Sequence, residues 1–115
     1  KGHPRVYLAG QITGVEGYLE SAASGVLAAL FITQRLRGLP HEAPPATTAL
    51  GALLRYVTAN DPDHYSPGNM TFALFDPSLF DGIAGLRRDD VRKGMATQAK
   101  TYFAGWRDAQ SDWLT

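Results

Sequence analysis

The chain has 115 residues, with eleven Lys and Arg against eleven Asp and Glu, so its formal net charge is zero. This length is enough for one domain, and the charge balance gives no electrostatic indication of nucleic-acid binding. The absence of cysteine excludes disulfides, thiolate metal ligands and cysteine nucleophiles within this chain. No targeting or membrane-spanning segment is recognised, so we expect a cytoplasmic protein without membrane contact.

The first expected element is a strand over residues 5–9. The apolar run from Val6 to Ala9 contains β-branched and aromatic side chains and stops at Gly10, which is typical of a strand covered on both faces. Such a strand needs neighbours on both edges. We therefore infer that the chain is a piece of a larger protein, with a natural small domain as the alternative.

A glycine-rich turn follows, with glycines at positions 10, 14 and 17. Thr13 and Glu16 have the spacing of a capping box, which predicts a helix start near Thr13 or Gly14. A helix N-terminus presents free N–H groups and the positive end of a dipole, which favours a negatively charged ligand. The alternative is a tight connection without a ligand, because this glycine spacing is not the dinucleotide fingerprint.

The next element is a long helix ending near residue 37. Between Ala22 and Ile32 only Ser24 and Gly25 are not apolar, which predicts a helix buried against a sheet. Gly38 and Pro40 are typical of a helix end. The expected fold class is thus α/β and mostly helical, with one buried strand, one long buried helix and two to three further helices.

Three further segments are expected downstream. Leucine periodicity predicts a helix over 47–59 with Thr47 as its N-cap, and alternating side chains predict an extended segment over 69–76. An apolar stripe from Val91 to Trp113 predicts a C-terminal helix over 88–113, used for packing. Asp61, Asp63 and His64 lack the spacing of metal ligands on one face, so we expect no metal site.

Two motifs carry a resemblance to known enzymes. The segment from Val6 to Gly25 resembles the C-terminal flavin-binding segment of the folate- and FAD-dependent tRNA uracil-5-methyltransferases. A sister family, the tRNA carboxymethylaminomethyl-modifying flavoproteins once called glucose-inhibited division protein A, shares the Leu8–Ile12 core. The segments 48–58 and 67–72 resemble the methyltransferase alone. Within the second segment, Gly68 and Thr71 depart from the pattern, where Met and Asn are expected.

The resemblance implies a C-terminal fragment, over 1–115, of a glutathione-reductase-like FAD-binding domain, with a strand–turn–helix flavin motif over 5–37. It implies that the parent enzyme takes a one-carbon unit from methylenetetrahydrofolate, uses FAD with NAD(P)H as reductant, and methylates C5 of a T-loop uridine in tRNA. The nucleophilic cysteines belong upstream, so this chain alone is expected to be inactive and to hold no catalytic residue. The implied flavin contacts are Gly10, Gln11, Gly14, Val15, Glu16, Gly17 and Tyr18.

Glu16 helps to choose the part of the flavin that is bound. A carboxylate in the first helical turn repels a pyrophosphate but is compatible with the edge of an isoalloxazine ring, whose carbonyl the N–H groups of residues 15–17 would bind. Tyr18 is expected to stack near the ring or to belong to the core. The rivals are the sister flavoprotein and a helical interaction module without a cofactor.

Overall fold

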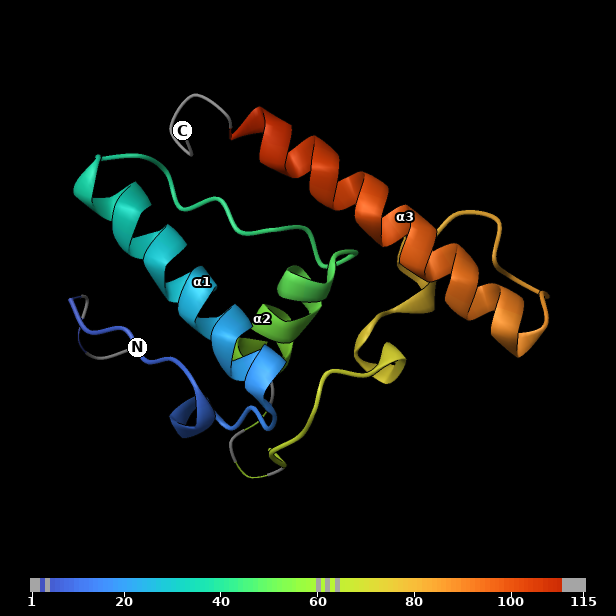
Figure 1. Ribbon diagram of the computed structural model, residues 1–115, viewed down its shortest axis with the longest axis horizontal. Coiled ribbons are helices and arrows are strands. Elements are labelled where there is room, and N and C mark those ends of the chain that lie inside the picture. The colour runs from blue at the N-terminus through green and yellow to red at the C-terminus, as the bar shows by residue number, and fades with distance from the viewer. Residues whose placement is uncertain (1–2, 4, 60, 62, 64, 111–115) are drawn as a thin grey trace.

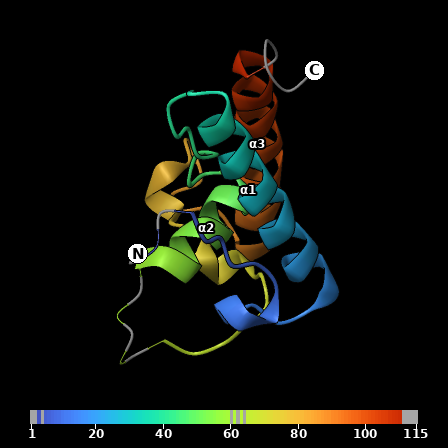
Figure 2. The ribbon, with the colours of Figure 1, turned by 90° about the vertical axis from the view of Figure 1, so that its left-hand side faces the viewer.

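The computed structural model describes residues 3, 5–59, 61, 63 and 65–110. Three α-helices account for half of this part: α1 (Tyr18–Leu36), α2 (Ala49–Ala59) and α3 (Arg88–Ala109). Short 3₁₀ helices are η1 (Gln11–Thr13), η3 (Phe72–Leu74) and η4 (Pro77–Leu79). Helix α2 lies between α1 and α3 in a flat molecule of 45 × 38 × 23 Å (Figure 1 and, turned by 90°, Figure 2).

Residues 5–9 do not form the buried strand that their side chains predict. They have no regular structure, and Val6 and Leu8 are 62% and 60% exposed. A strand is stable only when a neighbour accepts its backbone hydrogen bonds. Within the described ranges, the one β-type pairing is an isolated parallel bridge between Val15 and Gly68, so no such neighbour exists. The buried strand and the α/β class are therefore wrong for this part, which is helical.

Helix α1 begins later than the capping-box pattern predicts. It starts at Tyr18, with Gly17 at the N-cap in a left-handed region (φ 91°) and without a side-chain cap. The Thr13 hydroxyl instead donates to the carbonyl of Gly10 (2.7 Å), which closes η1. The predicted start near Thr13 or Gly14 is therefore wrong, because the threonine side chain was taken by a more local partner.

The predicted complete burial of α1 is also wrong. Only four of its residues are buried: Ser24, Leu27, Leu30 and Gln34. Leu19, Val26 and Leu36 lie on an exposed face, and the 5–10 segment runs along the N-terminal half of the helix (Figure 1). A hydrogen bond from the Gly10 N–H to Ser24 Oγ (2.7 Å) holds that segment there. Helix α1 thus packs on one side and presents apolar side chains on the other.

Helix α1 ends just before Gly38, as the sequence predicts. Gly38 (φ 67°) donates to the Arg35 carbonyl (3.1 Å), and Leu39 donates to the Gln34 carbonyl (2.8 Å). These two bonds form the Schellman arrangement that satisfies the last carbonyls of a helix. The chain then turns back along α1 toward α2.

Helix α2 begins under a loop that approaches it closely. Thr48, which precedes the helix, accepts a hydrogen bond from the Gly51 N–H (3.1 Å) through its side chain, so it takes the capping role expected of Thr47. A side chain at Gly51 would overlap the Pro45 carbonyl. Loop and helix therefore meet backbone to backbone at this point.

Helix α3 is held near its N-terminus by a small apolar cluster and by one side-chain amide. Phe80, Ile83 and Met95 form the buried part of the cluster. Gln98 donates to the Asp81 carbonyl (2.7 Å) and accepts from the Asp81 N–H (3.0 Å). The expected C-terminal helix corresponds to α3 as far as Ala109, and Trp113 of the predicted stripe lies outside the described residues. The expected extended segment contains η3, with extended backbone at Thr71 and Phe75.

The far end of α3 is linked to α1 through Glu42, which is bonded to a glutamine on each side. Gln34, which is 0% exposed, donates to the Glu42 carbonyl (3.0 Å) and accepts from the Glu42 N–H (3.2 Å). The Glu42 carboxylate in turn accepts a hydrogen bond from Gln110, just after α3. The radius of gyration is 15.1 Å, against about 13 Å for a compact domain of similar length. Hydrogen bonds, more than a large core, thus connect the helices.

The two glutamines give a matched pair for a stability measurement. We expect Gln34→Ala to lower the free energy of unfolding by about 1–3 kcal/mol, because it removes two hydrogen bonds at a buried site. Gln98→Ala removes the same pair of bonds in the open, and we expect a loss of about 1 kcal/mol or less. Urea unfolding followed by circular dichroism measures both. Equal losses would contradict the assignment of Gln34 as the buried link.

Candidate cofactor-binding turn

The glycine turn over residues 10–17 consists of η1 and the approach to α1. Three of its residues require the left-handed region that favours glycine: Gly10 (φ 79°), Gly14 (φ 83°) and Gly17 (φ 91°). Gly14 closes η1 by donating to the Gln11 carbonyl (2.9 Å). The backbone therefore reverses direction twice before α1 begins.

Gly14 is in contact with the ring of Tyr65, 51 residues away in sequence. A Cβ atom at Gly14 would overlap that ring, so the close approach requires glycine. The Tyr65 hydroxyl donates to the Thr13 carbonyl (3.0 Å). Burial raises the pKa of Tyr65 above its ordinary value, and the nearby Tyr56 raises it further. The protonated phenol is the form that makes this hydrogen bond.

The segment after Tyr65 is bonded to the turn along its length. The Glu16 N–H donates to the Gly68 carbonyl (2.9 Å), and the Gly68 N–H donates to the Gly14 carbonyl (3.2 Å). The Met70 N–H donates to the Glu20 carboxylate (2.8 Å). Glu20 is therefore a structural acceptor for this segment. The two sequence motifs that carry the resemblance thus meet in space.

These contacts divide the seven predicted flavin residues into two groups. Val15 is 1% exposed, and a side chain at Gly17 would meet Glu20 and Asn69, so Gly14, Val15 and Gly17 pack against the chain itself. Gln11, Glu16 and Tyr18 are exposed, and no atom lies within 4 Å of a Cβ built at Gly10. The first N–H groups of α1 have no side-chain cap. The surface that faces outward is therefore Gly10, Gln11 and the first turn of α1.

Sequence reasoning identified the glycine turn but not its partner. Tyr65, Asn69 and the Glu20–Met70 bond position the turn, and none was expected to do so. The available signal was the resemblance of the 67–72 segment to the same family, since two motifs of one site tend to be neighbours.

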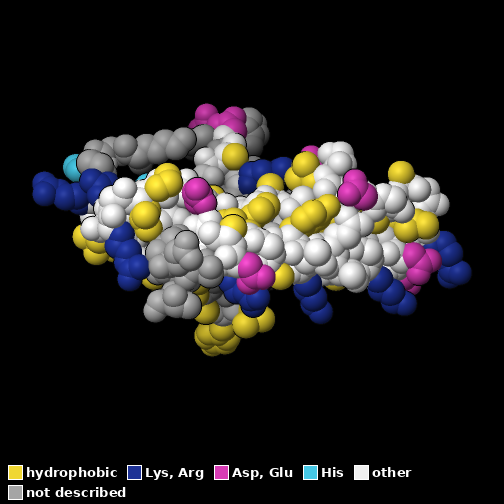
Figure 3. All heavy atoms as spheres, turned by 90° about the horizontal axis from the view of Figure 1, so that it is seen from above, with side chains coloured by type: hydrophobic (Ala, Val, Ile, Leu, Met, Phe, Trp, Pro, Cys, Tyr) yellow, Lys and Arg dark blue, Asp and Glu magenta, His cyan; other side chains and the backbone are white. Residues whose placement is uncertain are grey.

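Other kinds of site are not found in the described ranges. No group of three His, Asp or Glu side chains is close enough together to hold a metal ion. None of the helices described combines the length and hydropathy of a membrane crossing. On the face that Figure 3 shows, Lys and Arg side chains are spread around the edge with acidic side chains between them. That face has no concentrated basic patch.

Comparison with known proteins places the glycine turn in a family context. A family model described as glucose inhibited division protein A matches residues 1–40. A methylenetetrahydrofolate–tRNA-(uracil-5-)-methyltransferase TrmFO of Myxococcus xanthus is 46% identical over 110 residues, covering 92% of this chain and 23% of the relative. Proteins of the same name are 46% identical in Rhizorhabdus wittichii and 40% identical in Geotalea daltonii, covering 94% and 97% of this chain. The chain spans about a quarter of the length of these relatives.

The contact between Gly14 and Tyr65 is testable by substitution. Gly14→Ala adds backbone strain of about 1–2 kcal/mol and overpacking of about 1–3 kcal/mol. Gly85→Ala has a similar φ (79°) but open space around it, so we expect it to show the strain alone. Unfolding free energies from urea titration measure the difference.

A double variant separates packing from strain. Tyr65→Ala on its own removes the hydrogen bond to Thr13. In combination with Gly14→Ala it also removes the ring that the new methyl group overlaps, so we expect the double variant to regain the part of the unfolding free energy that overpacking cost. The raised pKa of Tyr65 also predicts how stability depends on pH. The hydrogen bond of Tyr65 contributes fully to stability below the ordinary phenol pKa, and this contribution is lost as the pH rises through the raised pKa of the folded protein. Fully additive losses in the double variant would contradict the contact.

Proposed function

We propose that this chain, which belongs to the methylenetetrahydrofolate–tRNA-(uracil-5-)-methyltransferase family, contributes part of the flavin site to an enzyme that methylates C5 of a tRNA uridine. In this proposal the enzyme uses methylenetetrahydrofolate as the one-carbon donor and FAD reduced by NAD(P)H. Sequence identity of 40–46% along nearly the whole chain supports it. The observation that carries it is that the two family motifs, the glycine turn and the 67–72 segment, are hydrogen-bonded to each other.

The outward surface of the turn fits a flat, polar ring edge. Gly10 leaves space beside Gln11, and the uncapped first turn of α1 offers backbone N–H groups. We propose that Gly10, Gln11 and the first N–H groups of α1 contact the isoalloxazine edge, while Gly14, the Val15 side chain and the Glu16 N–H hold the turn in shape. When bound, a flavin supplies redox chemistry that no side chain of this chain supplies. The helix dipole favours negative charge at the ring carbonyl.

In this proposal, the rest of the enzyme supplies the cysteine nucleophiles and covers the exposed apolar face of α1. This chain contains no cysteine, so the nucleophiles implied by the family belong elsewhere in that enzyme. The exposed apolar face of α1, with Val6 and Leu8 beside it, fits the packing of a further part of the same polypeptide. We propose that upstream part as the partner of this face, and tRNA as the substrate of the assembled protein.

The sister flavoprotein is the second candidate, and the family-model match over residues 1–40 favours it specifically. The decisive measurement is mass spectrometry of nucleosides from tRNA treated with the intact protein, methylenetetrahydrofolate and NADPH. We expect 5-methyluridine. Carboxymethylaminomethyl-modified uridine in its place would favour the sister family. A protein without flavin absorption or either product would favour an interaction module.

Substitution at Gly10 tests the flavin contact, because a Cβ atom there meets no atom of the chain within 4 Å. We expect Gly10→Val in the intact protein to lower flavin occupancy, read from visible absorption, at least tenfold, because the new side chain enters open space in front of the turn. Gly85→Val is the matched control, with the same φ of 79° and no neighbour within 4 Å. Equal flavin content in the two variants would contradict a ligand at Gly10.

A further inference from the structure

The carboxylate of Glu20 is fixed at the start of α1, where the flavin contacts are proposed. Glu20 is in the first turn of the helix, after the N-cap Gly17. One carboxylate oxygen, Oε1, accepts the hydrogen bond from the Met70 N–H (2.8 Å). The other oxygen, Oε2, lies against the backbone of Gly17, because a Cβ atom built on that glycine would overlap it. The two oxygens therefore have different neighbours: one holds the 65–70 segment, and the other is next to the N-cap.

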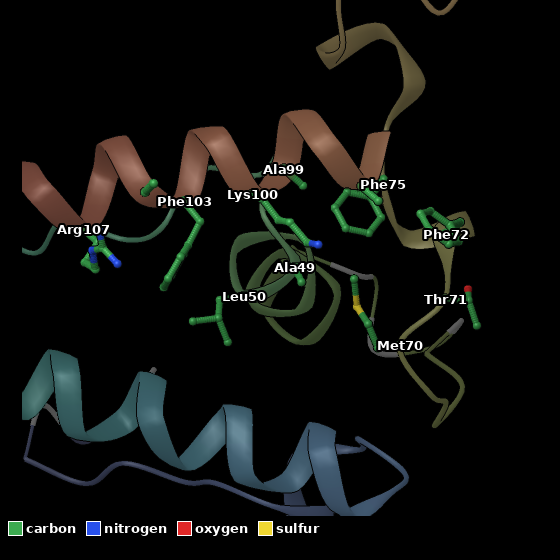
Figure 4. Close-up of a pocket in the computed structure, with 12 residues that line it drawn as sticks. Ala49, Leu50, Met70, Thr71, Phe72, Phe75, Ala99, Lys100, Phe103 and Arg107 are labelled. Atoms are coloured by element: carbon green, nitrogen blue, oxygen red, sulfur yellow. The ribbon is translucent and has the colours of Figure 1, made fainter. Parts of the chain in front are cut away.

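The partner of Glu20 is itself held in place. The side chain of Met70 lies beside Ala49 of α2, and both residues line a cavity of about 680 Å³ between α2 and α3 (Figure 4). The next element along the chain, η3, contacts α2. On its other side, Gly68 is bonded to the glycine turn through the Gly14 carbonyl and the Glu16 N–H. Because the segment that donates to Glu20 is attached at both ends, the half-buried carboxylate keeps its place.

A carboxylate in this position opposes the field of the helix. The first N–H groups of α1 have no side-chain cap and carry positive partial charge, equivalent to roughly half an elementary charge at a helix N-terminus. Among the described residues Glu20 forms no ion pair, so no cation cancels its charge locally. A group bound in front of α1 therefore experiences a less positive potential than the helix alone would give.

We propose that Glu20 lowers the reduction potential of the flavin, in addition to positioning the 65–70 segment. This inference rests on the proposed function, in which the first N–H groups of α1 contact the isoalloxazine edge. Reduction places negative charge at that edge, and charged groups near the ring tune its electronic properties. The Glu20 carboxylate repels the added charge and so disfavours the reduced form relative to the oxidised form. A lower potential makes the reduced flavin a stronger reductant.

Glu20→Gln separates the charge from the hydrogen bond. The amide oxygen of Gln accepts from the Met70 N–H as Oε1 does, and the negative charge is lost. In the intact, flavin-containing protein we expect the ratio of affinities for reduced over oxidised flavin to rise about three- to tenfold. For a two-electron couple this is a potential higher by about 15–30 mV. A spectroelectrochemical titration of the bound flavin measures the potential.

Two further variants are the controls. Glu20→Ala removes both the charge and the hydrogen bond, so we expect a similar rise in potential together with a lower midpoint of urea unfolding, which Glu20→Gln does not show. Asp89→Asn makes the same carboxylate-to-amide change in the first turn of α3, and we expect it to leave the potential unchanged.

The outcomes separate this inference from the proposed function. Equal potentials in wild type and Glu20→Gln, with flavin bound in both, would overturn the role of Glu20 and leave the proposed flavin site standing. A rise in Glu20→Ala alone would assign the effect to the lost hydrogen bond, and an equal rise in Asp89→Asn would assign it to net charge, so either result would also overturn the inference. An intact protein without flavin would overturn the proposed function, and this inference with it.

Discussion

The contact between the glycine turn and the 65–70 segment is the constraint on which the rest of the structure depends. The parallel bridge between Val15 and Gly68 is flanked by the Tyr65–Thr13 and Met70–Glu20 hydrogen bonds. Together they fix where α1 begins and where the chain leaves toward η3. Backbone and ring meet at Gly14 without a side chain between them, so this geometry requires glycine there. The proposed flavin surface is positioned by this one junction.

Side-chain amides of two glutamines join segments of the described chain that are not paired in a sheet. Gln34 and Gln98 each pair with both backbone groups of a single residue, Glu42 and Asp81, as a neighbouring strand would. Each pair is worth a modest net free energy in water, more where the glutamine is buried. The helices therefore keep their arrangement with few fully buried apolar side chains, and the apolar face of α1 is left available to a partner.

The sequence was sufficient for features governed by local chemistry and insufficient for those governed by distant contacts. Leucine periodicity indicated α2, and Gly38 marked the end of α1, because both signals act within a few residues. The strand at 5–9 was wrong because strand formation depends on a neighbour that local pattern cannot report. The start of α1 was wrong because Thr13 bonded to Gly10 in place of capping the helix. The pairing of Tyr65 with Gly14 required knowledge of the fold.

The way α3 is attached has a consequence for motion. Its bonds to the Asp81 backbone are exposed and its bond to Glu42 is a single part-buried one, whereas the glycine turn and the 65–70 segment are joined by two backbone bonds and two side-chain bonds. Amide protons of α3 should therefore exchange with solvent as one cooperative unit, separately from those of α1 and α2.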